Sequence, residues 1–237
     1  MTPTMLRVAD SCMKCGEKKK GFFCNLSPVD MKAFEALRLT SSYPRGVMLF
    51  TEGDLARGVM VLCKGHVKLT MTSSTGKVII LRLASPGEVL GLHSVISNAP
   101  LQASAETAEP CQVAFLRRED FLRYVGEHPQ AALRAAEQLS TGYEAACEQV
   151  RALALAPSAH GKLARFLLHL CHKSPASSND VCAKLTLTHE EIGQMIGVSR
   201  ETVTRTLGEF KSNHLVVLHG ASLQIPNKSA LQTMAGG

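Results

Sequence analysis

The sequence lacks the features of a membrane or secreted protein. No run in its 237 residues approaches the roughly eighteen apolar residues that a membrane-spanning helix needs. The first ten residues, Met-Thr-Pro-Thr-Met-Leu-Arg-Val-Ala-Asp, do not have the basic-then-apolar order of a signal peptide. We therefore expect a cytoplasmic protein, in which the eight cysteines serve as thiols or metal ligands rather than as structural disulfides.

The sequence also lacks the short motifs of common enzymes. It contains no Gly-x-Ser-x-Gly, no Walker loop and no dinucleotide fingerprint. His66 and His93 are isolated, without the His-x-His pair and nearby carboxylate with which barrel oxygenases hold a metal. An enzyme is therefore a distant alternative, and we expect a binding protein.

Charge is scarce and unevenly distributed. Charged residues make up 19% of the chain and apolar residues 45%, which is typical of a globular protein. Residues 1–25 carry a net charge of +3 and residues 158–237 carry another +3, whereas the segment between them is balanced. A basic C-terminal part fits contact with DNA phosphates, although +3 alone is too small to decide the function.

Residues 188–213 have the pattern of two short helices joined by a tight turn. Thr188, with Glu191 three residues later, has the spacing of a capping box, and Ser199 is a second N-cap candidate. Gly197 offers the positive φ that the turn needs. Apolar contacts between the helices are expected from Ile192, Ile196, Val198, Val203 and Leu207. The pattern predicts a helix-turn-helix whose second helix enters a major groove of DNA.

The second helix is expected to expose Arg200, Glu201, Thr204 and Arg205 near its N-terminal end. An arginine fork matches O6 and N7 of guanine, and a glutamate accepts a hydrogen bond from the cytosine amine. The alternative is an ordinary surface helix with solvated charges. We favour DNA binding because the caps, the turn glycine, the apolar spacing and the polar end coincide in one stretch.

The segment 26–128 consists of short apolar runs separated by glycine-containing turns. Strand length and composition occur at residues 59–62, 67–71, 78–83 and 112–116. Many short strands at regular spacing predict a jelly-roll or related barrel, and a helix over roughly 28–39 is expected to precede it.

Residues 1–25 contain three cysteines and little that would pack in a core. Cys12 and Cys15 are separated by two residues, so one turn of backbone can bring both sulfurs to one centre, and Cys24 follows. Thiolates suit iron–sulfur clusters and zinc. Three ligands are one short of a closed site, and Cys111, at the start of a predicted strand, is the candidate for the fourth. A metal-free or redox-thiol arrangement stays open. Packed thiols are expected at Cys63, Cys147, Cys171 and Cys182.

The longest helical pattern covers residues 129–155. Its apolar residues alternate by four and three, as in a coiled-coil seam: Ala132, Ala136, Leu139, Tyr143, Ala146, Val150 and Leu153. Packing on the chain's own barrel is one explanation. We prefer a dimer seam, because helix-turn-helix proteins usually bind two half-sites by twofold symmetry. Beyond the second helix of the turn motif, residues 215–225 predict a hairpin around Gly220, the wing of a winged helix, and a frayed tail.

The segment Gln-Met-Ile-Gly-Val-Ser-Arg-Glu-Thr-Val-Thr-Arg at 194–205 resembles the recognition region of the CRP/FNR family of bacterial transcription regulators. The resemblance extends over nearly the whole chain. It implies an α+β chain of four parts: a cysteine-containing arm (1–25), a cyclic-nucleotide-binding-like sensor barrel (26–128), a dimerisation helix (129–156) and a winged-helix DNA-binding domain (157–237). The partners it implies are palindromic double-stranded DNA, a second copy of the chain and RNA polymerase.

The resemblance also implies roles for single residues. In the family, bases are read by the residues matching Arg200, Glu201 and Arg205, and phosphates are contacted by those matching Thr188 and Ser199. Arg200 is what the CRP branch carries, whereas Thr204 resembles the hydroxyl residue of the FNR branch. We favour a CRP-like half-site.

FNR-type regulators hold an oxygen-labile [4Fe–4S] cluster with three cysteines of the arm and one of a barrel strand. Cys12, Cys15, Cys24 and Cys111 match this layout, although the gap of eight residues between Cys15 and Cys24 is longer than in the best-known members. The resemblance therefore implies sensing of oxygen, nitric oxide or redox state. The alternative is another small-molecule effector, with zinc or no metal at the cysteines. The predicted seam carries no charge, so we expect the dimer to persist without a cofactor.

The barrel of the CRP branch binds cyclic AMP through an acid near a phosphate-loop glycine and an arginine–serine pair. In this sequence Leu92 stands where the acid is expected, and Gln102 and Ala103 replace the pair. A phosphate without its arginine fork loses its strongest charge-assisted hydrogen bonds. We therefore do not expect cyclic AMP to be a ligand.

Overall fold

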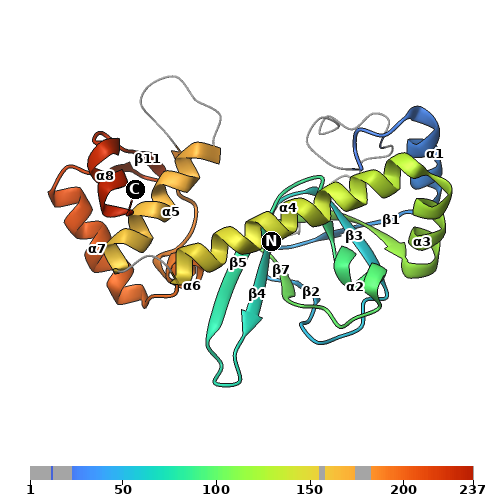
Figure 1. The fold of residues 1–237 in the computed structure, drawn as a ribbon, viewed down its shortest axis with the longest axis horizontal. Helices are drawn as coiled ribbons and strands as arrows, with labels where there is room; N and C mark the ends of the chain where they lie inside the picture. The colour runs from blue at the N-terminus through green and yellow to red at the C-terminus, as the bar shows by residue number, and fades with distance from the viewer. Residues whose placement is uncertain (1–11, 13–22, 155–157, 174–182, 237) are drawn as a thin grey trace, which may run out of the picture. The chain divides into compact units, whose positions relative to one another are not determined.

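The structure, a computed structural model, describes residues 12, 23–154, 158–173 and 183–236 (Figure 1). The chain divides into two compact units, residues 1–145 and 146–237. None of the helices in the described part of the chain is both long enough and apolar enough to cross a membrane.

The first unit contains a sandwich of two antiparallel sheets, each with four strands. One sheet has the order β1-β8-β3-β6 and the other has the order β2-β7-β4-β5. The strands are β1 (Leu39–Tyr43), β2 (Met48–Phe50), β3 (Gly58–Lys64), β4 (Val67–Thr72), β5 (Val78–Ala84), β6 (Val89–Leu90), β7 (Ser104–Thr107) and β8 (Cys111–Arg117). Strands distant in sequence, such as β1 and β8, are hydrogen-bonded neighbours. The predicted jelly-roll architecture is confirmed.

Two separate cores lie on the two faces of the sheet that contains β3 and β8. The sandwich interior contains residues from both sheets, among them Leu62, Ala105, Cys111 and Val113. The outer face carries Val59, Val61, Ala114 and Leu116. The alternation follows from the pleat of a strand, which directs successive side chains to opposite faces. We call these two clusters the interior core and the outer core.

Helices and the end of the N-terminal arm cover the outer core. These helices are α1 (Pro28–Leu37), α2 (Leu92–Ser97), α3 (Arg118–Glu127) and the first part of α4 (Pro129–Ala154). Phe23 is 1% exposed, and its ring lies 6.0 Å from that of Phe34 in α1 and 6.1 Å from that of Phe121 in α3. Such aromatic contacts bury large areas in a defined geometry. They fix the point at which the arm joins the barrel.

The long helix α4 has two stripes that face different surroundings. Ala131, Ala135 and Gln138 are buried against the barrel, and the Gln138 amide bonds the backbone N–H and C=O of Val89 in edge strand β6 at 2.9 and 2.6 Å. On another side of the helix, Tyr143 is 73% and Val150 is 63% exposed. Packing on the barrel and an exposed apolar stripe therefore coexist on α4. The predicted seam residue Leu139 packs against the outer core rather than lying on the exposed stripe.

The second unit is a winged helix-turn-helix around one core. Its elements are α5 (Ala159–Lys173), β9 (Ala183–Lys184), α6 (His189–Ile196), α7 (Arg200–Ser212), β10 (Val217–His219), β11 (Ser222–Gln224) and α8 (Lys228–Met234). The predicted wing is confirmed as β10 and β11, joined at Gly220 with a φ of 58°.

Two expectations for the second unit are wrong. The tail is not frayed, because Asn227 caps α8 by accepting the Ala230 N–H at 3.0 Å, and Leu231 is fully buried. A tertiary contact thus orders a segment that local composition left irregular. Cys171 is disulfide-bonded rather than a packed thiol.

Candidate nucleic-acid interface

The helix-turn-helix begins with α6, whose start is fixed by the predicted capping box. The Oγ1 of Thr188 accepts the Glu191 N–H at 3.1 Å, and the Thr188 N–H donates to the Glu191 carboxylate at 2.9 Å. Both bonds satisfy donors near the helix start that have no intrahelical partner. The helix ends at Gly197, whose φ of 71° lies in the left-handed region that favours glycine. The capping box and the turn glycine are confirmed.

Gly193 is a second glycine on which the turn depends, and it was not predicted. Its carbonyl accepts the N–H groups of Gly197 and Val198, the latter at 3.0 Å. A Cβ at this position would lie 2.7 Å from the Val198 carbonyl oxygen. Only glycine lets the backbone after the turn approach α6 so closely. The signal in the sequence was a glycine inside an otherwise helical pattern, four residues before Gly197.

One side of α7 is anchored in the core of the second unit. Ser199 caps the helix by accepting the Thr202 N–H at 3.2 Å. The inward-pointing residues are each 1% exposed: Val203, Thr206, Leu207 and Phe210. Val203, Leu207 and Phe210 pack together with residues of α5, α6, β11 and α8. This packing fixes the rotation of α7 about its own axis and so decides which side chains face outward.

The four predicted base-contact residues all lie on the exposed side of α7: Arg200, Glu201, Thr204 and Arg205. The Arg205 side chain is 70% exposed, and its Nε lies 3.9 Å from the Glu209 carboxylate. An exposed ion pair at this distance is weak, so the guanidinium remains available to a guanine edge. The structure thus brings the predicted residues together as one outward-facing set, which we call the polar end of α7.

Glu201 in the polar end is held as a carboxylate. Its own backbone N–H, the Ser199 hydroxyl and the Arg200 charge lower the pKa of Glu201 below its ordinary value of 4.5, whereas desolvation acts in the opposite direction. The side chain is therefore ionised at neutral pH. In that state it is an acceptor, as contact with a cytosine amine requires.

Thr204 is oriented by two partners. Its hydroxyl donates to the Arg200 carbonyl at 3.0 Å, and its Oγ1 lies 2.8 Å from Nδ1 of His189 on α6. Because the hydroxyl proton is committed to Arg200, Nδ1 of His189 is the donor in this pair. His189 therefore positions a predicted DNA-contact residue and was missed. No spacing rule in the sequence links residues of two different helices in this way.

Thr188 and Ser199, the predicted phosphate contacts, lie exposed at the N-termini of α6 and α7. Helix N-termini favour anions, because their N–H groups are unpaired and the helix dipole is positive there. The Thr188 hydroxyl donates to the Glu191 carboxylate at 3.0 Å, and Ser199 Oγ lies 3.0 Å from Thr202 Oγ1. Both hydroxyls would exchange these partners to bind phosphate, and their role stays a prediction.

The end of α4 contacts the helix-turn-helix at its turn. The Gln149 amide donates to the Met195 carbonyl at 2.7 Å. Leu153 lies so close to Gly197 that a Cβ on this glycine would be 2.9 Å from its Cδ2. The last turns of α4 are thus in direct contact with the segment that sets the angle between α6 and α7.

The predicted metal ligands are not brought together in the structure. Cys15 lies outside the described residues. Cys12 packs against the outer core and its N–H donates to the Glu35 carboxylate at 2.8 Å, whereas Cys111 lies in the interior core. Within the described ranges, no group of three His, Cys, Asp or Glu side chains is placed to hold a metal ion, so Cys12, Cys24 and Cys111 do not form one.

Cys111, the predicted fourth ligand, is enclosed inside the sandwich. Its Sγ lies 3.2 Å from the carbonyl oxygens of His66 and Glu109, to which the thiol donates, and the residue is fully buried. Burial, and then the Glu109 charge, raise the pKa of the Cys111 thiol above its ordinary value of 9.0. A Cβ on Gly65 would lie 2.7 Å from this sulfur. The protonated thiol fills a tight space inside the sandwich.

The residues at the positions of a cyclic-nucleotide site do not supply the acid and the arginine that such a site uses. Leu92 is 3% exposed and packs in the outer core, and Gln102 is exposed. Arg82, on β5, forms a close ion pair with Glu88, which also accepts the Ser85 N–H at 2.8 Å. No residue at the expected positions supplies the missing acid or arginine, so cyclic AMP as a ligand finds no support in these contacts.

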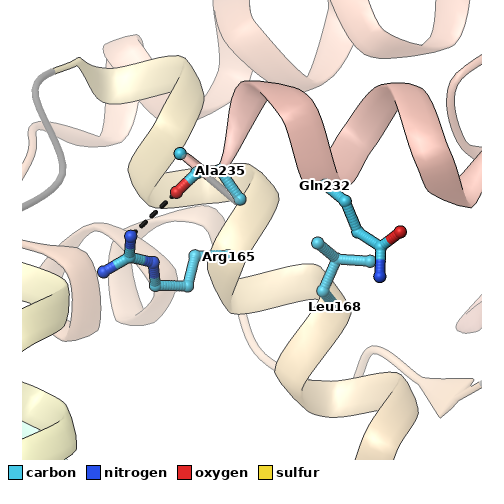
Figure 2. A pocket seen from close by; sticks show the side chains of 5 residues that line it. Arg165, Leu168, Gln232 and Ala235 are labelled. Carbon is cyan, nitrogen blue, oxygen red and sulfur yellow. Dashed lines mark hydrogen bonds between the residues drawn. The ribbon is translucent and has the colours of Figure 1, made fainter.

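A shallow cavity of about 450 Å³ lies between α5 and α8 (Figure 2). Arg165 is its one charged lining residue, and Leu168 and Gln232 lie on its other side. The guanidinium of Arg165 donates to the Ala235 carbonyl at 2.8 Å and to the Arg151 carbonyl at 3.4 Å. This arginine therefore ties the C-terminal helix to α5 and to the end of α4, and we assign the cavity no ligand.

Comparison with known proteins gives matches to both units. A family model for the cyclic nucleotide-binding domain matches residues 40–128, and one for the Crp-like helix-turn-helix domain matches residues 161–234. The cAMP-activated global transcriptional regulator CRP of Pasteurella multocida is 28% identical over 77% of this chain and 88% of its own. The cyclic AMP receptor protein of Thermus thermophilus is 26% identical over 93% of this chain and 99% of its own.

Solved structures share the fold at lower identity. FixK2 from Bradyrhizobium japonicum is 21% identical, with a TM-score of 0.69 over 83% of this chain and 96% of its own. The c-di-GMP responsive regulator CLP of Xanthomonas campestris is 20% identical, with a TM-score of 0.73 over 84% and 99%. With a cyclic-nucleotide-type barrel followed by a Crp-like helix-turn-helix, and with regulators of this type aligned along most of its length, the chain belongs to the CRP/FNR family of DNA-binding transcription regulators.

Proposed function

We propose that the protein acts as a homodimer that binds a palindromic operator, with α7 of each protomer in one of two successive major grooves. The observation that carries this proposal is the polar end of α7, in which Arg200, Glu201, Thr204 and Arg205 face outward while the opposite side of the helix is buried. Fixed packing on one side and exposed polar side chains on the other are what a recognition helix needs. RNA polymerase as a further partner stays a prediction from the family.

The experiment is fluorescence anisotropy with labelled palindromic fragments selected from random DNA. Replacing Arg200 or Arg205 by alanine should weaken specific binding by about 10- to 100-fold, because one bidentate contact to guanine contributes about 1–3 kcal/mol of discrimination. Lys211→Ala is the matched control, since it removes one positive charge from the exposed far end of the same helix. It should change specific and non-specific binding by the same small factor.

Two results would contradict the proposal. One is an absence of sequence preference in the wild-type protein under both oxidising and reducing conditions. The other is an equal loss of affinity in Arg200→Ala, Arg205→Ala and Lys211→Ala, which would mean that α7 contributes only general charge.

The exposed stripe of α4 supports the dimer. Tyr143 and Val150 are seven residues apart, which is the heptad spacing, and both are more than half exposed. Exposed apolar residues in register along a helix mark a protein contact. The stripe carries no charge at Ala146 or Cys147. We expect sedimentation of the metal-free protein at micromolar concentration to give a dimer, and a monomer alone would contradict this.

The signal that we propose is oxygen, nitric oxide or redox state, read by a thiolate-bound iron–sulfur cluster on the arm. Its support is the cysteine spacing of the arm, Cys12, Cys15 and Cys24, together with family membership. Cys111 lies in the interior core, whereas Cys12 packs against the outer core, so these contacts do not support Cys111 as the fourth ligand and its role stays a prediction. A cluster would supply the redox chemistry; the chain supplies thiolates that hold it and a buried Phe23 that ties the arm to the barrel.

Anaerobic purification distinguishes this proposal from its alternative, a small-molecule effector with zinc or no metal at the cysteines. Iron and sulfide in stoichiometric amounts, with visible absorbance lost in air, would support the cluster. Cys24→Ser should abolish both. Colourless, iron-free protein that still binds its operator normally would leave the DNA-binding proposal intact and end the cluster proposal.

A further inference from the structure

One helical turn beyond the polar end of α7 lies an acid, Glu209, whose carboxylate has two partners. Its Oε1 lies 3.9 Å from Nε of Arg205, and its Oε2 lies 2.5 Å from Nε2 of His160 in the first turn of α5. An ionised carboxylate only accepts hydrogen bonds, so the imidazole nitrogen is the donor. Glu209 is therefore hydrogen-bonded to His160, and its contact with Arg205 is too long for a hydrogen bond.

His160 is held in place from two sides. Its ring lies 5.9 Å from that of Phe210, which is 1% exposed, at an interplanar angle of 58°. Tilted contacts of this kind favour a defined ring orientation. The helix turn that carries His160 is capped by Ser158, whose Oγ accepts the Gly161 N–H at 3.0 Å. The imidazole therefore meets Glu209 from a fixed position, and the hydrogen bond restrains the Glu209 carboxylate.

The restraint on Glu209 bears on which edge of the Arg205 guanidinium is occupied. The carboxylate lies on the Nε side of a side chain that is 70% exposed. The two terminal nitrogens, Nη1 and Nη2, are not engaged by this carboxylate. Parallel N–H groups of an arginine are what O6 and N7 of guanine accept. The observed arrangement thus leaves Arg205 able to present its terminal fork to a base.

The same two residues could pair in a way that blocks this fork. Side chains four residues apart are neighbours on a helix, and a carboxylate can accept two parallel N–H groups from one arginine. In that pairing Glu209 would occupy the donors of Arg205 that guanine needs. The hydrogen bond from His160 opposes it, because it holds one carboxylate oxygen away from the fork.

We propose that His160 is a positioning residue for DNA recognition, which holds the Glu209 carboxylate away from the guanidinium fork of Arg205 and so keeps the fork open to a guanine. His160 and Glu209 act through Arg205 and not by contact with a base. The inference rests on the proposed contact of Arg205 with the operator. It adds to base recognition a residue of α5, a helix outside the helix-turn-helix.

The test is a double-mutant cycle, measured by fluorescence anisotropy of the full-length protein on the selected operator and on a copy without the guanine assigned to Arg205. That guanine is the base whose replacement no longer matters in Arg205→Ala. His160→Phe keeps a ring against Phe210 and removes the N–H donor. It should lower the ratio of the two affinities by about two- to fivefold, the range for an exposed ion pair between Glu209 and Arg205.

The second substitution of the cycle separates positioning from packing. The neutral amide of Glu209→Gln cannot form the competing ion pair. Adding His160→Phe to Glu209→Gln should therefore leave the affinity ratio of Glu209→Gln unchanged, whereas damage to packing would lower the ratio in both backgrounds. Glu190→Gln on α6 is the matched control, since it also removes one negative charge from the surface of the same unit. It should change both affinities by the same factor.

The outcomes distinguish this inference from the proposal on which it rests. A ratio for His160→Phe equal to that of the wild type, or a loss of the same size in the presence of Glu209→Gln, would overturn the positioning role alone. An unchanged ratio in Arg205→Ala would overturn the base contact of Arg205 and the positioning role with it.

Thermal unfolding of each variant confirms that the affinities compare folded proteins.

Discussion

The helices α4 and α7 each bury one side against a core, but their exposed sides differ in polarity. Each buries one stripe, α4 through Ala131 and Ala135 and α7 through Val203 and Leu207. The exposed stripe of α4 is apolar, whereas that of α7 is formed by charged and hydroxyl residues. Amphipathic periodicity therefore identifies a helix on a core, and the chemistry of the remaining side indicates the partner, a second protein for α4 and DNA for α7.

The largest effect is expected on the dimer, when a charged residue replaces an apolar one in the exposed stripe of α4. In Val150→Asp, a dimer would place two like charges against each other, which costs several kcal/mol, so the dimer dissociation constant should rise by about 100-fold or more. Sedimentation equilibrium measures it. Thr141→Asp adds the same charge on the opposite, exposed side of α4 and should leave the dimer intact. Equal constants for Val150→Asp and the wild type would remove the apolar stripe from the dimer contact.

A smaller effect is expected at the glycine that positions α7. Gly193→Ala places a Cβ 2.7 Å from the Val198 carbonyl, and such overpacking costs about 1–3 kcal/mol of folding free energy. Urea unfolding of the wild type and the variant gives the difference. Gly208→Ala in α7 is the matched control, because its Cβ would meet nothing within 4 Å. This control should be stabilised by about 0.5–1 kcal/mol, as helix propensity predicts. Similar effects of the two substitutions would contradict the close approach.

The smallest effect concerns the junction at which α4 begins. Asp30 of α1 lies 2.6 Å from Nδ1 of His128, whose carbonyl accepts the Ala131 N–H at 2.9 Å. Hydrogen bonds from Ser27 and then His128 lower the pKa of Asp30 below its ordinary value of 3.8. A lowered carboxyl pKa stabilises the fold above the unfolded pKa, and this stabilisation is lost as the pH falls through the lower, folded value.

Urea midpoints between pH 3 and 7 test this linkage. The wild type should lose stability at the acid end of the range, and Asp30→Asn should show a flatter profile there, since it has no carboxyl to titrate. Asp54→Asn, at an exposed position in the turn before β3, serves as the control. A wild-type profile that parallels that of Asp30→Asn would show that the junction does not depend on the charge of Asp30.

Features that depend on a few neighbouring residues were predictable. The capping box of Thr188 and Glu191 and the positive φ of Gly197 are local, because their bonds close within three or four residues. The strands of the barrel and the wing at Gly220 follow from alternation and turn glycines in the same way. The outward set Arg200, Glu201, Thr204 and Arg205 was also predictable, since helical periodicity separates it from the buried Val203 and Leu207.

Features that join distant segments were not predictable. The contact of His189 with Thr204 joins two helices, and the close approach of Gly193 to Val198 depends on their crossing. The order of α8 comes from the burial of Leu231. Sequence spacing alone could not separate the two stripes of α4, because both follow the same period and only the barrel distinguishes them.

The sequence by itself determined where α6 begins and ends, where α7 begins, which side chains α7 exposes, and that the arm is rich in thiols. Only the tertiary structure decided which barrel cysteine faces the arm. A strand has two faces, and one extra residue at Cys63 changes the register against Gln112. The pairing of β3 with β8, and not the spacing of the cysteines, therefore determines that Cys111 lies in the interior core and Cys63 in contact with the outer one.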